Sequence, residues 1–245
     1  MPDNPDAAHG PQAIPVRIRD VVKDYQSLRP LRIRELDIDK GQALALLGFD
    51  EAMAAVFVDL LTAGALPDSG EVVVFGRPTS AVTDHAEWMT MLDHFGLVSA
   101  RSVLLPQLTA EQNLAIPLTL TVKSMPPEIL GAVRRLADEI AIPPSHLTSP
   151  TFDLPPASLL RVRLGRALAL DPKVVLAEHP NATVSSEEAR AFAADLKRIR
   201  ASRGIATVVL TADPRFAAEV ADTVLTLQPA TGDLKVTSKW SRWFG

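Results

Sequence analysis

The sequence predicts an α/β domain whose mixed sheet core carries an antiparallel β-subdomain and an inserted helical subdomain. Near the N-terminus, residues 16–22 and 31–38 alternate with period two, as antiparallel strands with one solvent-facing side do. In the last third, apolar segments at 174–177, 206–211 and 223–227 are separated by helical segments, which is typical of a parallel sheet covered on both faces. Between them, residues 101–158 contain helical periods, many prolines and no convincing strand.

The remaining elements follow from local patterns. The apolar run 43–47 does not alternate, which indicates a strand buried on both faces, and an Ala- and Leu-rich helix follows it. A turn at 67–70 precedes a further strand. We expect a disordered leader at 1–13, one domain at 14–230 with its helical subdomain at about 101–158, and a C-terminal tail at 231–245. The expected elements are a strand at 71–75 and helices at 52–63, 128–140, 157–170, 186–202 and 215–220.

The composition excludes several classes of function. With 245 residues and 47% hydrophobic content, the chain can bury a full core. The absence of cysteine excludes disulfides, thiolate metal sites and a cysteine nucleophile. A net charge of −4 gives no overall basic field, so no nucleic-acid partner is expected. No apolar run is long enough to span a bilayer, and the acidic start is unlike a signal peptide, so we expect a cytoplasmic protein.

Several segments, taken in their order and spacing along the chain, resemble one known family. They are KGQALALLG at 40–48, LLTAGALPDSGEVVVFGR at 61–77, LLPQLTAEQNLAIPLTL at 104–120, RVRLGRALALDPKVVLAEHPNATVS at 161–185 and TVVLTAD at 207–213. In this order and spacing they resemble the nucleotide-binding subunit of an ABC transporter, over about 16–227. Within that family the chain is most similar to the branch that serves lipoprotein release, macrolide export and lipid trafficking.

This resemblance implies an ABC-ATPase fold, which is similar to that of P-loop NTPases. It also implies ATP and Mg²⁺ as ancestral ligands, with no cofactor expected from the residues themselves. The implied partners are a membrane permease and a second nucleotide-binding subunit, either a paralogue or a copy of the chain. The implied location is the cytoplasmic face of a membrane.

The phosphate loop of the family corresponds to the residues after the strand at 43–47. Such a loop needs glycines, a lysine for the β- and γ-phosphates and a hydroxyl for Mg²⁺. Here Glu51 and Met53 stand at glycine positions, and Ala54 and Ala55 replace the lysine and the serine. The carboxylates of Asp50 and Glu51 would repel a polyphosphate. We therefore expect no phosphate binding by this loop. Its positions are Gly48, Asp50, Glu51, Met53, Ala54 and Ala55.

The other motifs of the family are also recognisable by their position, but the residues that contact nucleotide or Mg²⁺ in the family are replaced. Ala100 stands at the glutamine that links Mg²⁺ to the permease interface, and Ala212 stands at the switch histidine. Glu178 and His179 match the Walker B Asp-Glu pair, and Ser185 matches the D-loop aspartate. The signature LSGGQ corresponds to Leu154, Pro155, Pro156, Ala157 and Ser158, where two prolines remove N–H donors. No catalytic position is expected to be functional.

Two of these positions allow other interpretations. Tyr25 stands where the family stacks an aromatic ring on adenine, but an ordinary strand-end aromatic explains it as well. Glu178 and His179 are favoured as a polar pair satisfied by a neighbouring loop over metal ligands, and no metal site is expected. Trp240 and Trp243 beside cations suit a membrane-interface anchor or a docking peptide, and equally packing on the domain or disorder.

The functional expectation is a degenerate ATP-binding subunit. It would dock on a permease as a structural or regulatory partner, with residues 100–117 lining the groove for a permease helix. One alternative is an active ABC transporter ATPase with an unconventional site completed by a partner subunit. The other is a soluble regulatory pseudo-ATPase.

Overall fold

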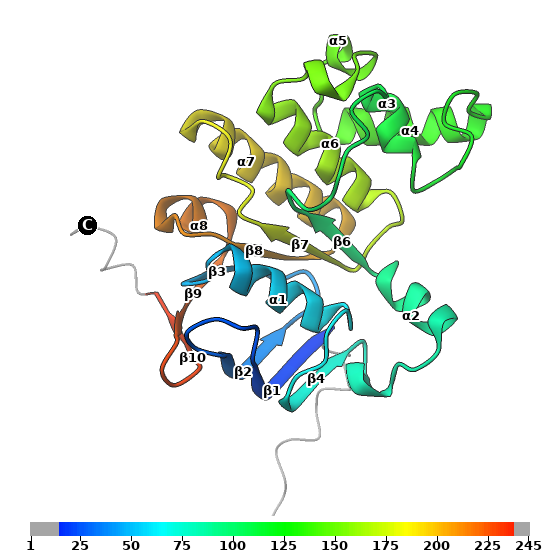
Figure 1. The fold of residues 1–245 in the computed structure, drawn as a ribbon. Helices are drawn as coiled ribbons and strands as arrows, with labels where there is room; N and C mark the ends of the chain where they lie inside the picture. The colour runs from blue at the N-terminus through cyan, green and yellow to red at the C-terminus, as the bar shows by residue number, and fades with distance from the viewer. Residues whose placement is uncertain (1–14, 238–245) are drawn as a thin grey trace, which may run out of the picture.

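The computed structural model describes residues 15–237, which form two sheets with helices packed between and around them (Figure 1). The smaller sheet is antiparallel, with strand order β2-β1-β4-β5. The larger sheet has the order β10-β9-β3-β8-β7-β6, and all its neighbouring pairs are parallel except β10 with β9. The strands are β1 (Val16–Lys23), β2 (Leu31–Ile38), β3 (Ala43–Leu47), β4 (Ser69–Val74), β5 (Arg77–Pro78), β6 (Phe95–Val98), β7 (Val174–Glu178), β8 (Ala206–Leu210), β9 (Thr223–Gln228) and β10 (Asp233–Val236).

Helix α1 lies between the two sheets and closes one half of the core (Figure 1). Its apolar side chains, among them Phe57 and Leu61, contact the buried faces of both sheets. Residues of β3 alternate between this half and the other: Leu44 and Leu46 face α1, whereas Ala45 faces away. The central strand is therefore buried on both sides, as its non-alternating sequence predicts.

The opposite face of the large sheet is covered by three helices, and the helical subdomain packs on one of them. In α6, Gly165 allows this close approach, because a Cβ there would lie 2.4 Å from the Leu114 side chain and 2.9 Å from Ile140. The helices are α1 (Glu51–Leu61), α2 (His85–Leu92), α3 (Ala110–Ala115), α4 (Pro127–Glu139), α5 (Pro144–Leu147), α6 (Pro156–Leu168), α7 (Ser186–Arg203) and α8 (Pro214–Val220), with 3₁₀ turns at Thr79–Ala81 and Thr151–Asp153.

The predicted fold class is confirmed, but several short elements were missed, among them β5, β6, β10, α2, α3 and α5. The short strand β6 and helix α2 were not predicted, because few residues carry each pattern and β6 lies at the sheet edge. Strand β10 extends the sheet past residue 230, where the sequence placed the end of the domain. The leader at 1–13 and Trp240 and Trp243 of the tail lie outside the described residues. Between residues 15 and 237, no helix is both long and apolar enough to cross a membrane.

Candidate functional site

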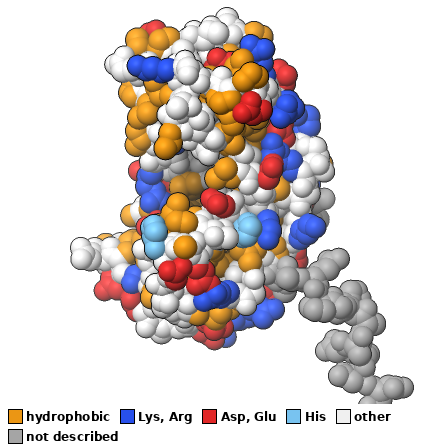
Figure 2. All heavy atoms as spheres, turned by 90° about the vertical axis from the view of Figure 1, so that its right-hand side faces the viewer, with side chains coloured by type: hydrophobic (Ala, Val, Ile, Leu, Met, Phe, Trp, Pro, Cys, Tyr) orange, Lys and Arg blue, Asp and Glu red, His pale blue; other side chains and the backbone are white. Residues whose placement is uncertain are grey.

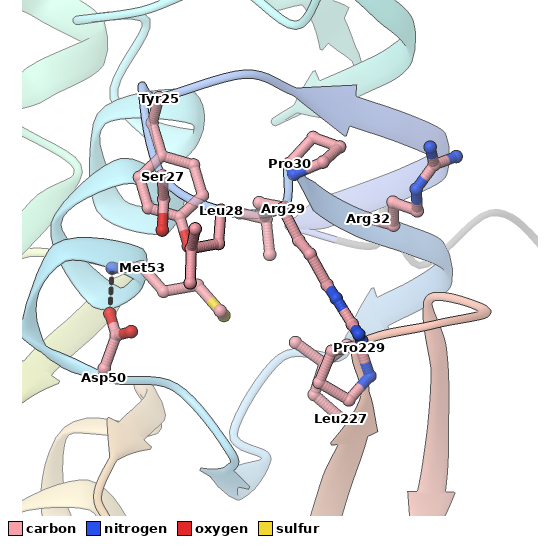
Figure 3. A pocket seen from close by; sticks show the side chains of 11 residues that line it. Tyr25, Ser27, Leu28, Arg29, Pro30, Arg32, Asp50, Met53, Leu227 and Pro229 are labelled. Carbon is pink, nitrogen blue, oxygen red and sulfur yellow. Dashed lines mark hydrogen bonds between the residues drawn. The ribbon is translucent and has the colours of Figure 1, made fainter.

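The loop between β3 and α1 is only three residues long, because α1 begins at Glu51. Gly48 adopts a positive φ of 86°, which favours glycine. Asp50 is the N-cap: its carboxylate accepts a hydrogen bond of 2.7 Å from the backbone N–H of Met53 (Figure 3). The N–H of Ala54 donates to the Asp50 carbonyl at 2.8 Å. The helix N-terminus, where backbone N–H groups bind anions in many proteins, therefore holds a carboxylate of the chain itself.

The segment 48–55 itself contributes no basic side chain to the helix start. Ala54, which the sequence analysis assigns to the family's lysine position, is completely buried in the core around α1. Phe49 is also buried, and its ring packs edge to face on Phe57 with centroids 5.5 Å apart. Glu51 is exposed and adds a second carboxylate in the first turn. The segment thus continues the helix and the core where a phosphate loop would wrap around its ligand.

Glu178, at the end of β7, is held by residues that follow β6. Its carboxylate accepts hydrogen bonds from the hydroxyl of Ser99 and from two nitrogens of Arg101, with the Nε contact at 3.1 Å. Arg101 also contacts Asp59 of α1 at 3.3 Å. The hydrogen bonds to Glu178 raise the pKa of the Arg101 guanidinium above its usual range. These charge-assisted hydrogen bonds join β7, α1 and the 99–101 loop.

The residues next to Glu178 differ in their surroundings. His179 has a positive φ of 44°, and its backbone N–H donates to the carbonyl of Leu210 at 2.9 Å. Its ring Nε2 is buried without a hydrogen-bond partner among the described residues. Ala100 and Ala212 are exposed methyl groups and offer no polar atom beyond the backbone. Ser185 caps α7 and accepts a hydrogen bond from the N–H of Glu188.

The segment 154–158, which the sequence analysis aligns with the family signature, begins α6, with Pro155 as N-cap and Pro156 as the first helical residue. No side chain caps this helix start. The hydroxyl of Ser158 is buried and lies 2.7 Å from Nδ1 of His146, so it points into the subdomain. Leu154 and Ala157 are buried as well. The segment is therefore packed as a helix start whose hydroxyl already has a partner inside the chain.

Two cavities flank the start of α1. The first, about 340 Å³, is lined by Tyr25, Arg29, Asp50 and Met53 among others (Figure 3). The second, about 280 Å³, lies around Glu178. It is also lined by Glu51, Ser99, Ala100, Arg101, Leu160, Arg163, His179 and Thr183.

The structure thus brings Tyr25 near the β3–α1 loop and brings Ala100, Glu178 and His179 together. Ala212 and the signature residues line neither cavity. In the described part of the chain, no group of three or more histidines and carboxylates could hold a metal ion.

Sequence reasoning missed the residues that surround Glu178. In the sequence, Glu178 is 79 positions from Ser99, 77 from Arg101 and 119 from Asp59. No sequence motif connects residues at such separations. Arg163 of α6, which belongs to none of the motif positions, also lines the second cavity. The only available signal was the position of Ser99 and Arg101 beside Ala100, at the carboxyl end of a strand in an open sheet.

No family model matches the chain, but individual proteins do. The chain is 26% identical over 183 residues to the ABC transporter ATP-binding protein YtrE of Bacillus subtilis, covering 74% of this chain and 78% of YtrE. It is 31% identical over 221 residues to the phosphonates import ATP-binding protein PhnC of Anaeromyxobacter dehalogenans, covering 87% and 44%. It is 29% identical to the macrolide export ATP-binding/permease protein MacB of Salmonella typhimurium, covering 75% and 28%. The chain therefore spans less than half the length of PhnC and MacB.

Solved structures agree on the fold. The dimeric ATP-binding cassette MJ0796, bound to ADP and Pi, superposes with a TM-score of 0.75 at 21% identity, over 91% of this chain and 98% of that chain. The cbiO1 protein of Clostridium perfringens, part of the ABC transporter complex cbiONQ, superposes with a TM-score of 0.77 at 17% identity, over 91% and 87%. The fold is that of an ABC ATPase cassette. In sequence, the chain is similar to ABC transporter ATP-binding proteins, a macrolide export protein among them.

Proposed function

We propose that this chain is an ABC-type subunit that binds a membrane permease as a structural or regulatory partner and does not hydrolyse ATP. It would sit at the cytoplasmic face of the membrane, paired with an active paralogue or with a copy of itself. The names of its relatives, which include import and export ATP-binding proteins, support the link to a transporter.

The proposal rests mainly on the N-terminus of α1, where a side chain of the protein itself already accepts a backbone N–H group. The Asp50 carboxylate accepts a hydrogen bond from the backbone N–H of Met53, and Glu51 places a second carboxylate in the first turn. A polyphosphate approaching this helix start would meet negative charge where a binding site needs N–H donors and cations. Phosphoryl transfer depends on neutralising the γ-phosphate, and neither a lysine nor a free metal-binding carboxylate is available here, since Glu178 is paired with Arg101.

Binding of Mg-ATP tests this part of the proposal directly. We expect calorimetry of the purified full chain to detect no binding up to millimolar nucleotide. The variant Glu51→Gly/Ala54→Lys restores two family residues, but the side chain at 54 faces the core, so we expect destabilisation and still no binding. Micromolar binding by the unmodified protein would refute the proposal.

A groove between the sheet and the helical subdomain supports docking on a permease. A cavity of about 220 Å³ is lined by Leu97, Pro117 and Leu170 together with Arg166, and Val103 nearby exposes 70% of its surface. The guanidinium of Arg166 donates to the Val103 carbonyl at 2.7 Å, which fixes this loop beside α6. Figure 2 shows this side of the molecule, with a hollow between its upper and lower lobes. An apolar hollow with a polar rim suits an inserted helix of a partner.

Co-purification from membranes tests the docking. We expect the tagged full chain to retain a permease identified by mass spectrometry. The variant Val103→Asp should lose it, whereas Val236→Asp, an equally exposed valine on β10, should retain it. Recovery of no membrane protein, or equal recovery with both variants, would refute the docking.

The cavity at Tyr25 favours a second candidate, an ATPase with an unconventional site completed by a partner subunit. Tyr25 and Met53 line a space of about 340 Å³, within the about 300–1,000 Å³ usual for small-molecule pockets. An aromatic ring there could stack on a base. The same Mg-ATP titration separates the two candidates, because only this one expects binding that Tyr25→Ala removes.

A further inference from the structure

Arg166 on α6 places a positive charge in the groove proposed for docking. It lines the cavity of about 220 Å³ together with Leu97, Pro117 and Leu170. Burial lowers the pKa of its guanidinium, and no carboxylate between residues 15 and 237 forms an ion pair with it. A partly buried cation without a counter-charge is costly, so the groove favours an anionic group.

Most hydrogen-bond donors of this guanidinium are unused. Nη1 of Arg166 donates to the carbonyl of Val103 at 2.7 Å, whereas Nε and Nη2 form no hydrogen bond within the described part of the chain. The N–H groups of Nε and Nη2 lie on one edge of the planar guanidinium and match the two oxygens of a carboxylate. Arg166 can therefore keep its contact with Val103 and bind a carboxylate at the same time.

The carboxylates of the chain itself leave this position open. Asp93 is the one acidic residue among the described residues that line the groove, and it is exposed and forms no ion pair with Arg166. Burial also lowers the pKa of Arg163 on the same helix. Arg163 lines a different cavity, however, whose wall includes the carboxylate of Glu178. In the docking groove, Arg166 is the cation that a partner would meet.

The apolar wall determines which kind of anion fits. Leu97 and Leu170 flank the charge, and beside the groove Val103 exposes 70% of its surface. A free ion would leave this apolar surface in water, whereas a protein helix with a carboxylate on its apolar face would cover the surface and also meet Arg166. Helix residues three or four positions apart lie on the same face. The complementary surface is therefore a helix face with one acidic residue between apolar ones.

We propose that Arg166 selects the permease partner by pairing with an Asp or Glu side chain on the apolar face of its inserted helix. Apolar residues three or four positions from that acid would cover Val103. The inference rests on the proposed function, because it names the chemistry that the partner presents at the docking groove. A permease without the acid would leave the guanidinium buried and unpaired, so Arg166 is a specificity-determining residue of the interface.

Co-purification with the tagged full chain from detergent-solubilised membranes tests this, with the retained permease quantified by mass spectrometry. Arg166→Gln should lower recovery about tenfold or more, because it removes one charge of a desolvated ion pair. Arg166→Lys should lower recovery less, because it keeps the charge but loses the planar pair of donors. Arg166→Glu should abolish recovery by repulsion. Arg134→Glu, at an exposed arginine on α4 of the same subdomain, is the matched control and should leave recovery unchanged.

Salt dependence separates pairing from a purely structural role. Arg166 also fixes the loop at Val103, so a change there could move the groove wall. Gln and Lys can both donate to the Val103 carbonyl, but only Lys keeps the charge. Recovery by the unmodified chain should fall as the NaCl concentration rises, and the residual recovery by Arg166→Gln should fall less. Thermal unfolding by circular dichroism checks that each variant remains folded.

Photocrosslinking identifies the segment that enters the groove. The chain has no cysteine, so Val103→Cys provides a single thiol for a photoreactive maleimide. We expect the labelled segment of the permease to contain an Asp or Glu with apolar residues three or four positions away. Replacing that acid with Lys should restore binding of the Arg166→Glu variant.

Four results would overturn the inference and leave the docking intact. They are equal recovery by Arg166→Gln and the unmodified chain, equal salt dependence of the two, a labelled segment without an acidic residue, or binding to permease-free vesicles of phosphatidylglycerol and phosphatidylcholine that Arg166→Gln removes. The last result would assign the charge to a lipid phosphate. Recovery of no permease by the unmodified chain would refute the docking itself, and the inference with it.

Discussion

Replacing Arg101 with alanine is expected to destabilise the protein by about 2 kcal/mol, a value between the two limits known for ion pairs. Removing one partner of a fully buried pair costs about 3–5 kcal/mol, and an exposed pair contributes about 0.2–1 kcal/mol. The Glu178 side chain is only 8% exposed, whereas that of Arg101 is 44% exposed. Without Arg101, Glu178 would keep the hydroxyl of Ser99 as its partner but would lose its counter-charge.

Thermal unfolding measures this effect. In a domain of this size a change of 1 kcal/mol shifts Tm by about 2–4 °C, so Arg101→Ala should lower Tm by about 4–8 °C. The double variant Arg101→Ala/Glu178→Gln should recover most of the loss, because no unpaired charge remains buried. Arg190→Ala is the control: its contact with Glu219 is 3.8 Å long and both side chains are exposed, so we expect a change within about 0.5 kcal/mol.

The reasoning would be refuted in two ways. A loss for Arg101→Ala as small as that of Arg190→Ala would mean that the cluster is a solvated surface pair. A double variant as unstable as the single one would mean that Arg101 acts through packing and not through the charge of Glu178.

Three further predictions concern the helices. Asp50→Ala should cost about 1 kcal/mol through loss of the N-cap of α1, measured by urea unfolding, and an unchanged midpoint would contradict the cap. Gly165→Ala should cost about 1–3 kcal/mol by overpacking, whereas Gly131→Ala on α4, with only a flexible side chain 3.5 Å away, should gain up to about 1 kcal/mol of helix propensity. Equal effects of the two glycine changes would refute the close packing. Hydrogen bonds from Ser185 lower the pKa of the Glu188 carboxyl below its ordinary 4.5, so its stabilisation is complete above that pH and is lost as pH falls through the folded value. Glu188→Gln should therefore lower Tm more at neutral pH than in acid, and the reverse order would contradict the assignment.

Much of the fold could be predicted from the sequence because the signals are local. The period of the apolar residues in β1 and β2 and the unbroken apolar run of β3 depend only on neighbouring positions. Strand β10 was missed because it is four residues long and half-exposed, and its pairing with β9 depends on a turn at 229–232. Short edge strands carry too few buried positions for a pattern to stand out.

For the site, the sequence by itself predicted which residues replace the family motifs, with Ala54 in place of the lysine as the main change. It could not say what those replacements do. Only the tertiary structure decided that Asp50 caps α1 and that Ala54 faces the core. It also decided that Arg101 reaches Glu178, 77 positions away, and that Arg163 and His179 line one cavity. These contacts join distant segments, so they depend on how sheets and helices pack and not on any local pattern.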